Sequence, residues 1–103
     1  MRDKYYILKG HEAVPTDDDI LAWAKWFEKS DRHVANETIG NARISTVFLG
    51  LDHNFGPQGP PLIFETMVFG GALDQEQERY STWEEAETGH KAMAQRVKEA
   101  EHS

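Results

Sequence analysis

The strongest periodic pattern in the chain predicts an amphipathic helix near the C-terminus. Five side chains recur at alternating spacings of three and four residues and so share one helical face. These residues are Trp83, Ala86, His90, Met93 and Val97. Two overlapping capping boxes precede the pattern, one pairing Ser81 with Glu84 and the other pairing Thr82 with Glu85. We therefore expect a helix that runs from there to about Ala100.

A shorter helical pattern covers residues 20–27, where four apolar side chains share a face. They are Ile20, Trp23, Ala24 and Phe27. Thr16 is suited to N-cap this helix, because the aspartates at 17–19 would then meet the positive end of the helix dipole. Ser30 and Asp31 are expected to end it. Trp26 lies on the flank of the face, where a tryptophan either packs half-buried or anchors an interface.

Four β-favouring runs, at residues 5–8, 34–39, 42–51 and 62–69, predict strands. Gly40 and Asn41 separate the second and third runs, as is typical of a tight hairpin turn. We expect an α+β fold in which residues 1–103 form one domain. Its sheet is predicted to be a single antiparallel sheet of about four strands with two helices, in the order β-α-β-β-β-α.

The strand at residues 42–51 is apolar on both faces. Ile44 and Phe48 point to one side of it, while Val47 and Leu49 point to the other. Strands of this kind are covered on both sides. The two helices cover both faces if one lies on each. Alternatively, both helices lie on the same face and a second subunit covers the other. We favour the second arrangement, which makes the protein a homodimer.

Two connections stand out. Residues 52–61 hold two glycines and three prolines, and they form a longer loop than hairpins ordinarily use. This loop is either a semi-rigid binding element or a surface excursion. After Gly70 and Gly71, the acidic residues 74–78 are expected to form a connector that leads to the last helix.

Composition and charge narrow the function classes. Eighteen acidic and eleven basic side chains leave a formal charge of −7 at pH 7, which argues against generic nucleic-acid binding because phosphates attract cations. Cysteine is absent, so disulfides, thiolate metal sites and cysteine nucleophiles are excluded. No apolar run approaches the ~20 residues of a membrane helix. The first residues lack the apolar core of a signal peptide, so we expect no membrane association and an intracellular location.

Asp52 and His53 stand where a two-faced strand meets the 52–61 loop. Functional side chains are common at such strand ends, although an aspartate there also caps local amides. Together with Glu65 and His90 they could serve a small metal-dependent hydrolase, in which case the four side chains would converge on one point. The sequence contains no HExxH or HxH spacing that would fix two metal ligands on one element.

Glu65 and His90 also have structural interpretations. Glu65 interrupts an apolar strand, where a carboxylate needs a partner such as Arg43 or Arg79. His90 lies in the middle of an apolar helix face, either as a neutral core histidine or as a general base. The neighbouring Gly89 lowers helix stability, which indicates a close approach by another element.

Two stretches carry a family resemblance. ISTVFLGLDH at residues 44–53, followed by PPLIFETMVFGG at residues 60–71, resembles a family of small, functionally uncharacterised proteins of bacteriophages and prophages. RYSTWEEAETGH at residues 79–90 is similar to a second signature of that family. The resemblance covers roughly half the chain and leaves residues 10–43 outside it. It implies a phage accessory protein that works in the bacterial host cytoplasm, and it brings no activity, fold or catalytic residue with it.

We favour a non-enzymatic binding module, used for host takeover or against host defence, that binds a host protein or sequesters a small nucleotide signal. In the nucleotide case, Arg43 or Arg79 would pair with phosphate, and an aromatic ring would stack on the base. The candidate binding residues are Asp52, His53, Phe55, Arg43, Glu65, Arg79, Tyr80, His90 and Trp26. The alternatives are the metal-dependent hydrolase and a structural or assembly protein of the virion. No cofactor is expected.

Overall fold

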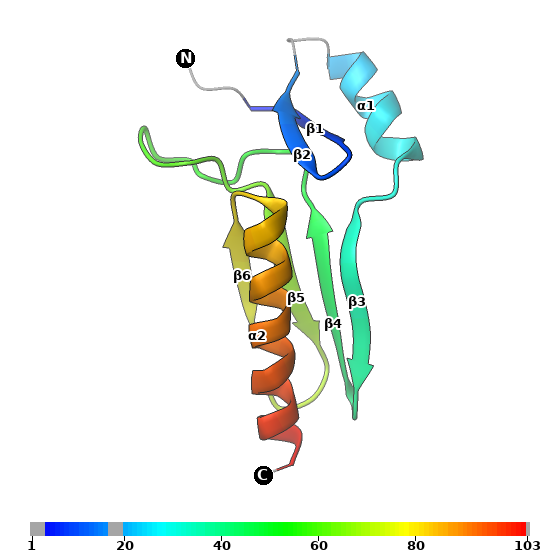
Figure 1. Cartoon of the computed structure of the whole chain (residues 1–103), viewed down its shortest axis with the longest axis vertical. Coiled ribbons are helices and arrows are strands. Elements are labelled where there is room, and N and C mark those ends of the chain that lie inside the picture. The colour runs from blue at the N-terminus through cyan, green and yellow to red at the C-terminus, as the bar shows by residue number, and fades with distance from the viewer. Residues whose placement is uncertain (1–3, 17–19, 103) are drawn as a thin grey trace.

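The protein contains two helices and two β-sheets in a computed structural model that describes residues 4–16 and 20–102. The elements are β1 (Tyr6–Lys9), β2 (Glu12–Pro15), α1 (Ile20–Lys29), β3 (His33–Ile39), β4 (Ala42–Phe48), β5 (Phe64–Phe69), β6 (Gln77–Tyr80) and α2 (Trp83–Glu101) (Figure 1). The α+β class and both helices are confirmed.

The main sheet is antiparallel, with the strand order β3-β4-β5-β6. Ile44 of β4 lies opposite Val68 of β5 and Glu37 of β3, so these three side chains share one face. The predicted tight turn joins β3 to β4, and its Gly40 has a φ of 58°, a left-handed conformation that favours glycine. The hairpin predicted from the Gly-Asn pair is confirmed.

The predicted single sheet and the predicted order β-α-β-β-β-α are only partly correct, because there are two sheets and the order is β-β-α-β-β-β-β-α. The first strand does not join the main sheet but pairs with β2 in a separate two-stranded sheet. The fourth strand of the main sheet is β6, which begins inside the segment that we expected to be a connector. Gln77–Tyr80 carries no alternating apolar pattern, and its strand conformation comes from pairing with β5 across a turn that includes Gly70 and Gly71 at positive φ.

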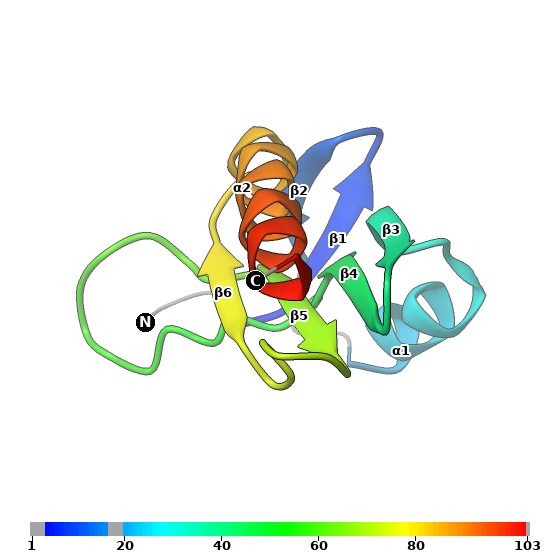
Figure 2. The ribbon, with the colours of Figure 1, turned by 90° about the horizontal axis from the view of Figure 1, so that it is seen from below.

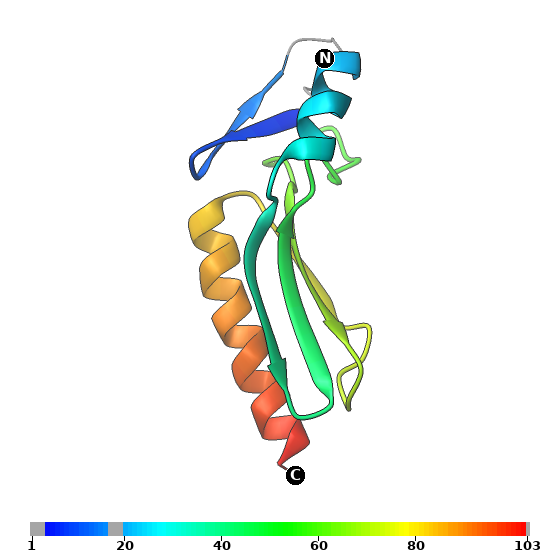
Figure 3. The same cartoon turned by 90° about the vertical axis from the view of Figure 1, so that its right-hand side faces the viewer.

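α2 covers one face of the main sheet and buries most of the core (Figure 3). Along the C-terminal half of the helix, Met93 and Val97 pack against Ile44 and Val68. Nearer its N-terminus, Ala86 belongs to a second cluster with Phe48, Phe64, Ile63 and Tyr6. Seen along its length in Figure 2, the helix lies over the strands, with the hairpin of β1 and β2 beyond its N-terminal end.

α1 covers neither face of the main sheet but lies at one end of it, beside β1 (Figure 3). Its Trp23 indole N–H donates to the backbone oxygen of Tyr6 at 2.9 Å, and Trp26 makes an edge-on contact with Phe48. The packing interpretation of Trp26 therefore fits its surroundings. Thr16 hydrogen-bonds to the Tyr5 backbone oxygen, and the aspartates expected in the first turn of this helix lie outside the described residues.

The sheet face opposite α2, called here the outer face, is not covered by any described element. Val47 and Met67 are half-buried there, and Phe69 is 40% exposed beneath the guanidinium of Arg43. The described residues therefore cover the two-faced strands on one side only.

Candidate functional site

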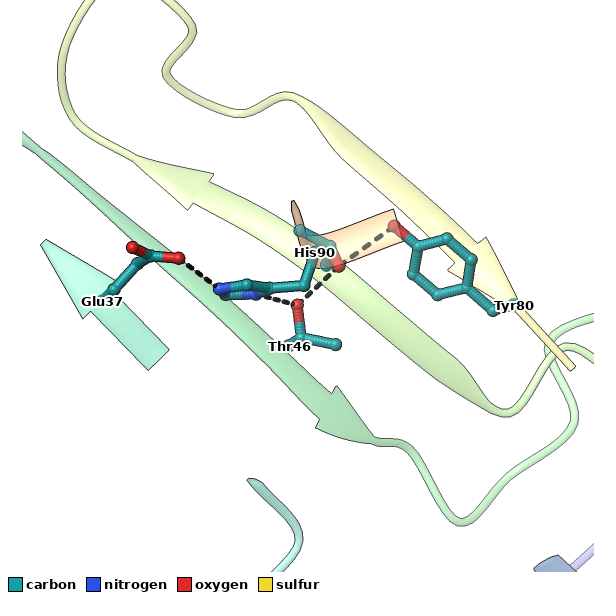
Figure 4. A network of polar contacts seen from close by, with 5 residues as sticks. Glu37, Thr46, Tyr80 and His90 are labelled. Atoms are coloured by element: carbon teal, nitrogen blue, oxygen red, sulfur yellow. Dashed lines mark hydrogen bonds and ion pairs between the residues drawn. The ribbon is translucent and has the colours of Figure 1, made fainter. Parts of the chain in front are cut away.

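A chain of hydrogen bonds crosses the interface between α2 and the main sheet (Figure 4). His90 of α2 lies at its centre, with its Nε2 atom 2.8 Å from Glu37 on β3 and its Nδ1 atom 2.6 Å from the Thr46 hydroxyl on β4. The Thr46 hydroxyl lies 2.6 Å from that of Thr66 on β5, and the Tyr80 hydroxyl on β6 donates to Thr66 at 3.0 Å. One residue from each of the four strands of the main sheet is thus connected to His90 by hydrogen bonds.

The hydrogen-bond direction along this network follows from the carboxylate at its end. An ionised carboxylate only accepts, so the His90 Nε2–H donates to Glu37, and in the neutral imidazole the Nδ1 atom then accepts from Thr46. Thr66 then donates to Thr46 and accepts from Tyr80. Every member is satisfied in one direction, which is the arrangement that stabilises a buried polar network.

Tyr80 passes directly beneath α2 at Gly89. A Cβ atom at position 89 would overlap the ring and hydroxyl of Tyr80, so only glycine allows this approach. The close contact that we expected at Gly89 is present. Burial raises the pKa of the Tyr80 hydroxyl above its ordinary value of 10.0.

A groove of about 620 Å³ runs between β6 and the N-terminal half of α2, and we call it the β6–α2 groove. Its lining residues come from the end of β6, the residue after it, the N-terminal half of α2 and the residue two before β5. They are Leu62, Arg79, Tyr80, Ser81, Glu84, Glu85, Thr88 and Gly89. Tyr80 therefore belongs to both the groove and the hydrogen-bond network.

The α2 side of the groove is acidic. Glu84 and Glu85 are exposed there, and one oxygen of Glu85 also accepts from the backbone N–H groups of Ser81 and Thr82. Arg79 borders the groove on β6, but its side chain lies on the outer face beside its cross-strand neighbour Glu65, and its Nε–H donates to that carboxylate at 3.0 Å. The prediction that Glu65 needs an arginine partner is confirmed, and the partner is Arg79.

One edge of β6 is open. In the described part of the chain, β6 pairs only with β5. The Val68 backbone N–H donates to Glu76, and hydrogen-bonded positions alternate along antiparallel strands, so Glu78 and Tyr80 direct their backbone groups toward β5. The backbone N–H and C=O groups of Gln77 and Arg79 therefore face the open edge.

The predicted binding residues fall into three places. Arg79 and Tyr80 line the β6–α2 groove, Glu65 is paired with Arg79, and His90 is linked to Tyr80 through Thr46 and Thr66. Asp52, His53 and Phe55 lie in the 52–61 loop. Arg43 lies on the outer face and Trp26 against the core. A single site that joins all nine residues is not present.

The 52–61 loop is closed by its own side chains. One oxygen of the buried Asp52 accepts from the backbone N–H groups of Asn54 at 2.8 Å and Leu62 at 2.9 Å, which bridges the two ends of the loop. The His53 Nδ1 atom lies 2.9 Å from the Leu51 backbone oxygen. Phe55 is 84% exposed. Asp52 therefore has the amide-capping role that was one of its two interpretations.

The proposed hydrolase residues do not come together. Glu65 is paired with Arg79, His90 is bonded to Glu37 and Thr46, and Asp52 holds the loop. Among the described residues, no three His, Asp or Glu side chains lie close enough to hold a metal ion.

Glu37, Thr46 and Thr66 are site residues that the sequence reasoning did not identify. A signal for two of them was present, because Thr46 lies between Ile44 and Phe48 on the core-facing side of β4, and Thr66 occupies the same kind of position on β5. A hydroxyl in such a place needs a buried partner. Glu37 carries no comparable signal, since it lies on an edge strand.

The chain matches no family model, no curated protein and no solved structure. No helix in the described part of the chain is long and apolar enough to cross a membrane.

Proposed function

We propose that this protein is a non-enzymatic binding module that takes an extended segment of a partner protein in the β6–α2 groove. The observation that carries this proposal is the open edge of β6 along the groove. A segment that adds to a sheet edge gains main-chain hydrogen bonds and places alternate side chains in the adjoining pocket. Here Gln77 and Arg79 offer the backbone groups, and Tyr80 and α2 form the pocket.

The groove is less suited to the nucleotide alternative. Arg79 would have to leave Glu65 to bind phosphate, and Glu84 and Glu85 on the facing wall would repel a phosphate group. The second candidate cation, Arg43, lies against Phe69 on the outer face. A partner protein is therefore the class that we favour.

The network behind the groove supports a positioning role more than a catalytic one. Thr46 and Thr66 are fully buried, so their hydroxyl groups are not accessible to a substrate. His90 uses both ring nitrogens within the protein. We propose that the network holds Tyr80 and α2 in register and so keeps the groove in shape.

Selection of a displayed library of short linear peptides on the immobilised protein tests this function. Gln77→Pro removes an outward N–H, a change that an edge strand tolerates, whereas the matched variant Gln77→Ala keeps the N–H and removes the side chain. We expect selected peptides to bind Gln77→Ala like the wild type, and to bind Gln77→Pro at least about tenfold more weakly. In the wild type, backbone NMR shifts should change along β6 and the first turns of α2.

Two results would contradict the proposal. One is a set of peptides that binds Gln77→Pro as tightly as the wild type, which would place binding elsewhere than the edge of β6. The other is a selection that enriches no peptide sensitive to this proline. Far-ultraviolet circular dichroism of both variants serves as the control for folding.

The biological setting that we propose is a small phage accessory protein in the bacterial cytoplasm, with a host protein as the partner. Its support is the resemblance of residues 44–53, 60–71 and 79–90 to proteins of bacteriophages and prophages. Residues 79–90 include most of the groove, so the stretch that carries the second signature also carries the proposed site.

We also propose that two copies of the chain pair through the outer face. The half-buried Val47 and Met67 and the exposed Phe69 support this, because they form an apolar patch that no described element covers. Glu65 and Arg79 beside them neutralise each other, so this face avoids the repulsion that a charge of −7 imposes elsewhere.

A further inference from the structure

We infer that the segment bound in the β6–α2 groove presents a lysine or arginine side chain to Tyr80 and the acidic wall of α2. This inference rests on the proposed function and adds the chemical class of the partner. It identifies the partner segment as extended and basic.

The charges around the groove favour a cationic side chain. Glu84 and Glu85 are exposed on the α2 wall, and Glu78 lies on the same face of β6 as Tyr80. The charge of Arg79 is offset by Glu65, whose side chain is only 15% exposed. An incoming cation therefore meets exposed carboxylates, and an incoming carboxylate would meet like charge.

The ring of Tyr80 is held in one position. Its hydroxyl is fixed by Thr66 and, through Thr46, by His90, while the glycine at position 89 lets the ring lie directly under the helix. An aromatic ring held in one place beside carboxylates is the combination that recognises ammonium and guanidinium groups. Because the ring is already positioned, binding does not have to order it.

The lining of the groove agrees with a long basic side chain. Leu62 and Tyr80 offer apolar contacts to a methylene stem, and Glu84 and Glu85 lie where a terminal charge would be stabilised. An aliphatic residue of the same length would keep the contacts and lose the charge interaction. Norleucine, which is lysine without its ammonium group, therefore isolates the contribution of the charge.

The test uses a selected peptide that binds the Gln77→Pro variant more weakly than the wild type. In analogues of this peptide, each basic residue in turn is replaced with norleucine or glutamate. We expect one position at which norleucine weakens binding about tenfold and glutamate weakens it further. Glu84→Gln should reduce the preference for lysine over norleucine to about threefold. Glu87→Gln removes the same charge from the side of α2 away from the groove and should leave the preference unchanged.

The outcomes separate the two proposals. A proline-sensitive peptide that binds equally well with norleucine at every position would overturn the inference and leave the proposed function standing. A lysine preference that survives Glu84→Gln and disappears in Glu87→Gln would also overturn it. If no peptide is sensitive to Gln77→Pro, the proposed function is wrong and the inference with it. Salt should reduce the lysine preference, because exposed charges are screened.

Discussion

The contact between Gly89 and Tyr80 determines how closely α2 approaches β6. Glycine in a helix ordinarily costs about 1 kcal/mol of stability relative to alanine. Where no other element lies close to the helix, replacing the glycine with alanine therefore stabilises the protein. Here any side chain would overlap the tyrosine ring, and the ring cannot move without giving up its hydrogen bond to Thr66. The glycine therefore belongs to the packing of the groove.

We predict that Gly89→Ala destabilises the protein although it raises helix propensity. The added methyl group must displace either Tyr80 or the helix, and overpacking of this kind costs about 1–3 kcal/mol. Urea unfolding followed by tryptophan fluorescence measures the change. Thr88→Ala, at the exposed neighbouring position, is the matched control and should be neutral or slightly stabilising. A Gly89→Ala variant as stable as the wild type would show that the ring is free to move.

His90 shows how one buried polar residue specifies an arrangement of several elements. Its two ring nitrogens contact β3 and β4 directly, and the threonine pair extends the connection to β5 and β6. A shift of α2 by one residue would leave these buried groups without partners, which costs about 1–3 kcal/mol for each. The histidine thus fixes the position of the helix on the sheet.

At the scale of elements, α2 begins at one of the two overlapping capping boxes. The Thr82 hydroxyl accepts from the Glu85 backbone N–H at 3.1 Å, and Glu85 in return accepts from the Thr82 N–H. The Ser81 backbone N–H donates to the same carboxylate. The start of the helix, and with it the α2 wall of the groove, therefore depends on Thr82 and Glu85.

We predict that Thr82→Ala lowers the free energy of unfolding by about 1 kcal/mol, because the first turn loses its side-chain acceptor. Ser81→Ala keeps the backbone N–H that Glu85 uses, and it should change stability by a few tenths of a kcal/mol at most. Chemical unfolding of the two variants in parallel measures the difference. Equal losses would mean that the helix start exchanges between the two boxes.

Sequence reasoning identified the elements whose local signals agree with their surroundings. The spacing from Trp83 to Val97 and the capping box predict α2, and the Gly-Asn turn predicts the β3–β4 hairpin. β6 was not predicted, because its four residues are mostly polar and its conformation depends on pairing with β5. β2 was missed for the same kind of reason, since it is short and pairs only with β1.

The candidate site was predictable in part. Tyr80, Arg79 and His90 were identified from their neighbours in sequence, and the glutamate–arginine pairing followed from the cost of a lone buried charge. The contact between His90 and Glu37 joins residues 53 positions apart, and that between His90 and Thr46 joins residues 44 apart. The local sequence does not show which strand residue packs against a given helix residue. These partners of His90 could therefore be identified only from the three-dimensional structure.

At the scale of the whole molecule, the described part of the chain provides one covering helix for a sheet that has two faces. α2 buries one face, and α1 together with the β1–β2 hairpin closes an end of the sheet instead of its other face (Figure 3). The outer face keeps a half-buried apolar patch with paired charges beside it. A second copy, related by a two-fold axis, offers the same patch to cover it.

We predict that the wild-type protein is a dimer in solution and that Met67→Lys makes it monomeric. A lysine at the centre of the outer face would be buried against its symmetry mate, and an unpaired buried cation is strongly unfavourable. Light scattering coupled to size-exclusion chromatography, over a range of concentrations, measures the mass. Leu21→Lys places the same charge on a 76% exposed leucine of α1 and should leave the dimer intact.

A monomeric wild type would mean that the outer face tolerates water. A dimer disrupted by Leu21→Lys but not by Met67→Lys would place the interface at α1. In the expected dimer, the open edges of β6 in both copies stay free, because pairing through the sheet face does not use the strand edge. Each dimer would therefore carry two peptide grooves.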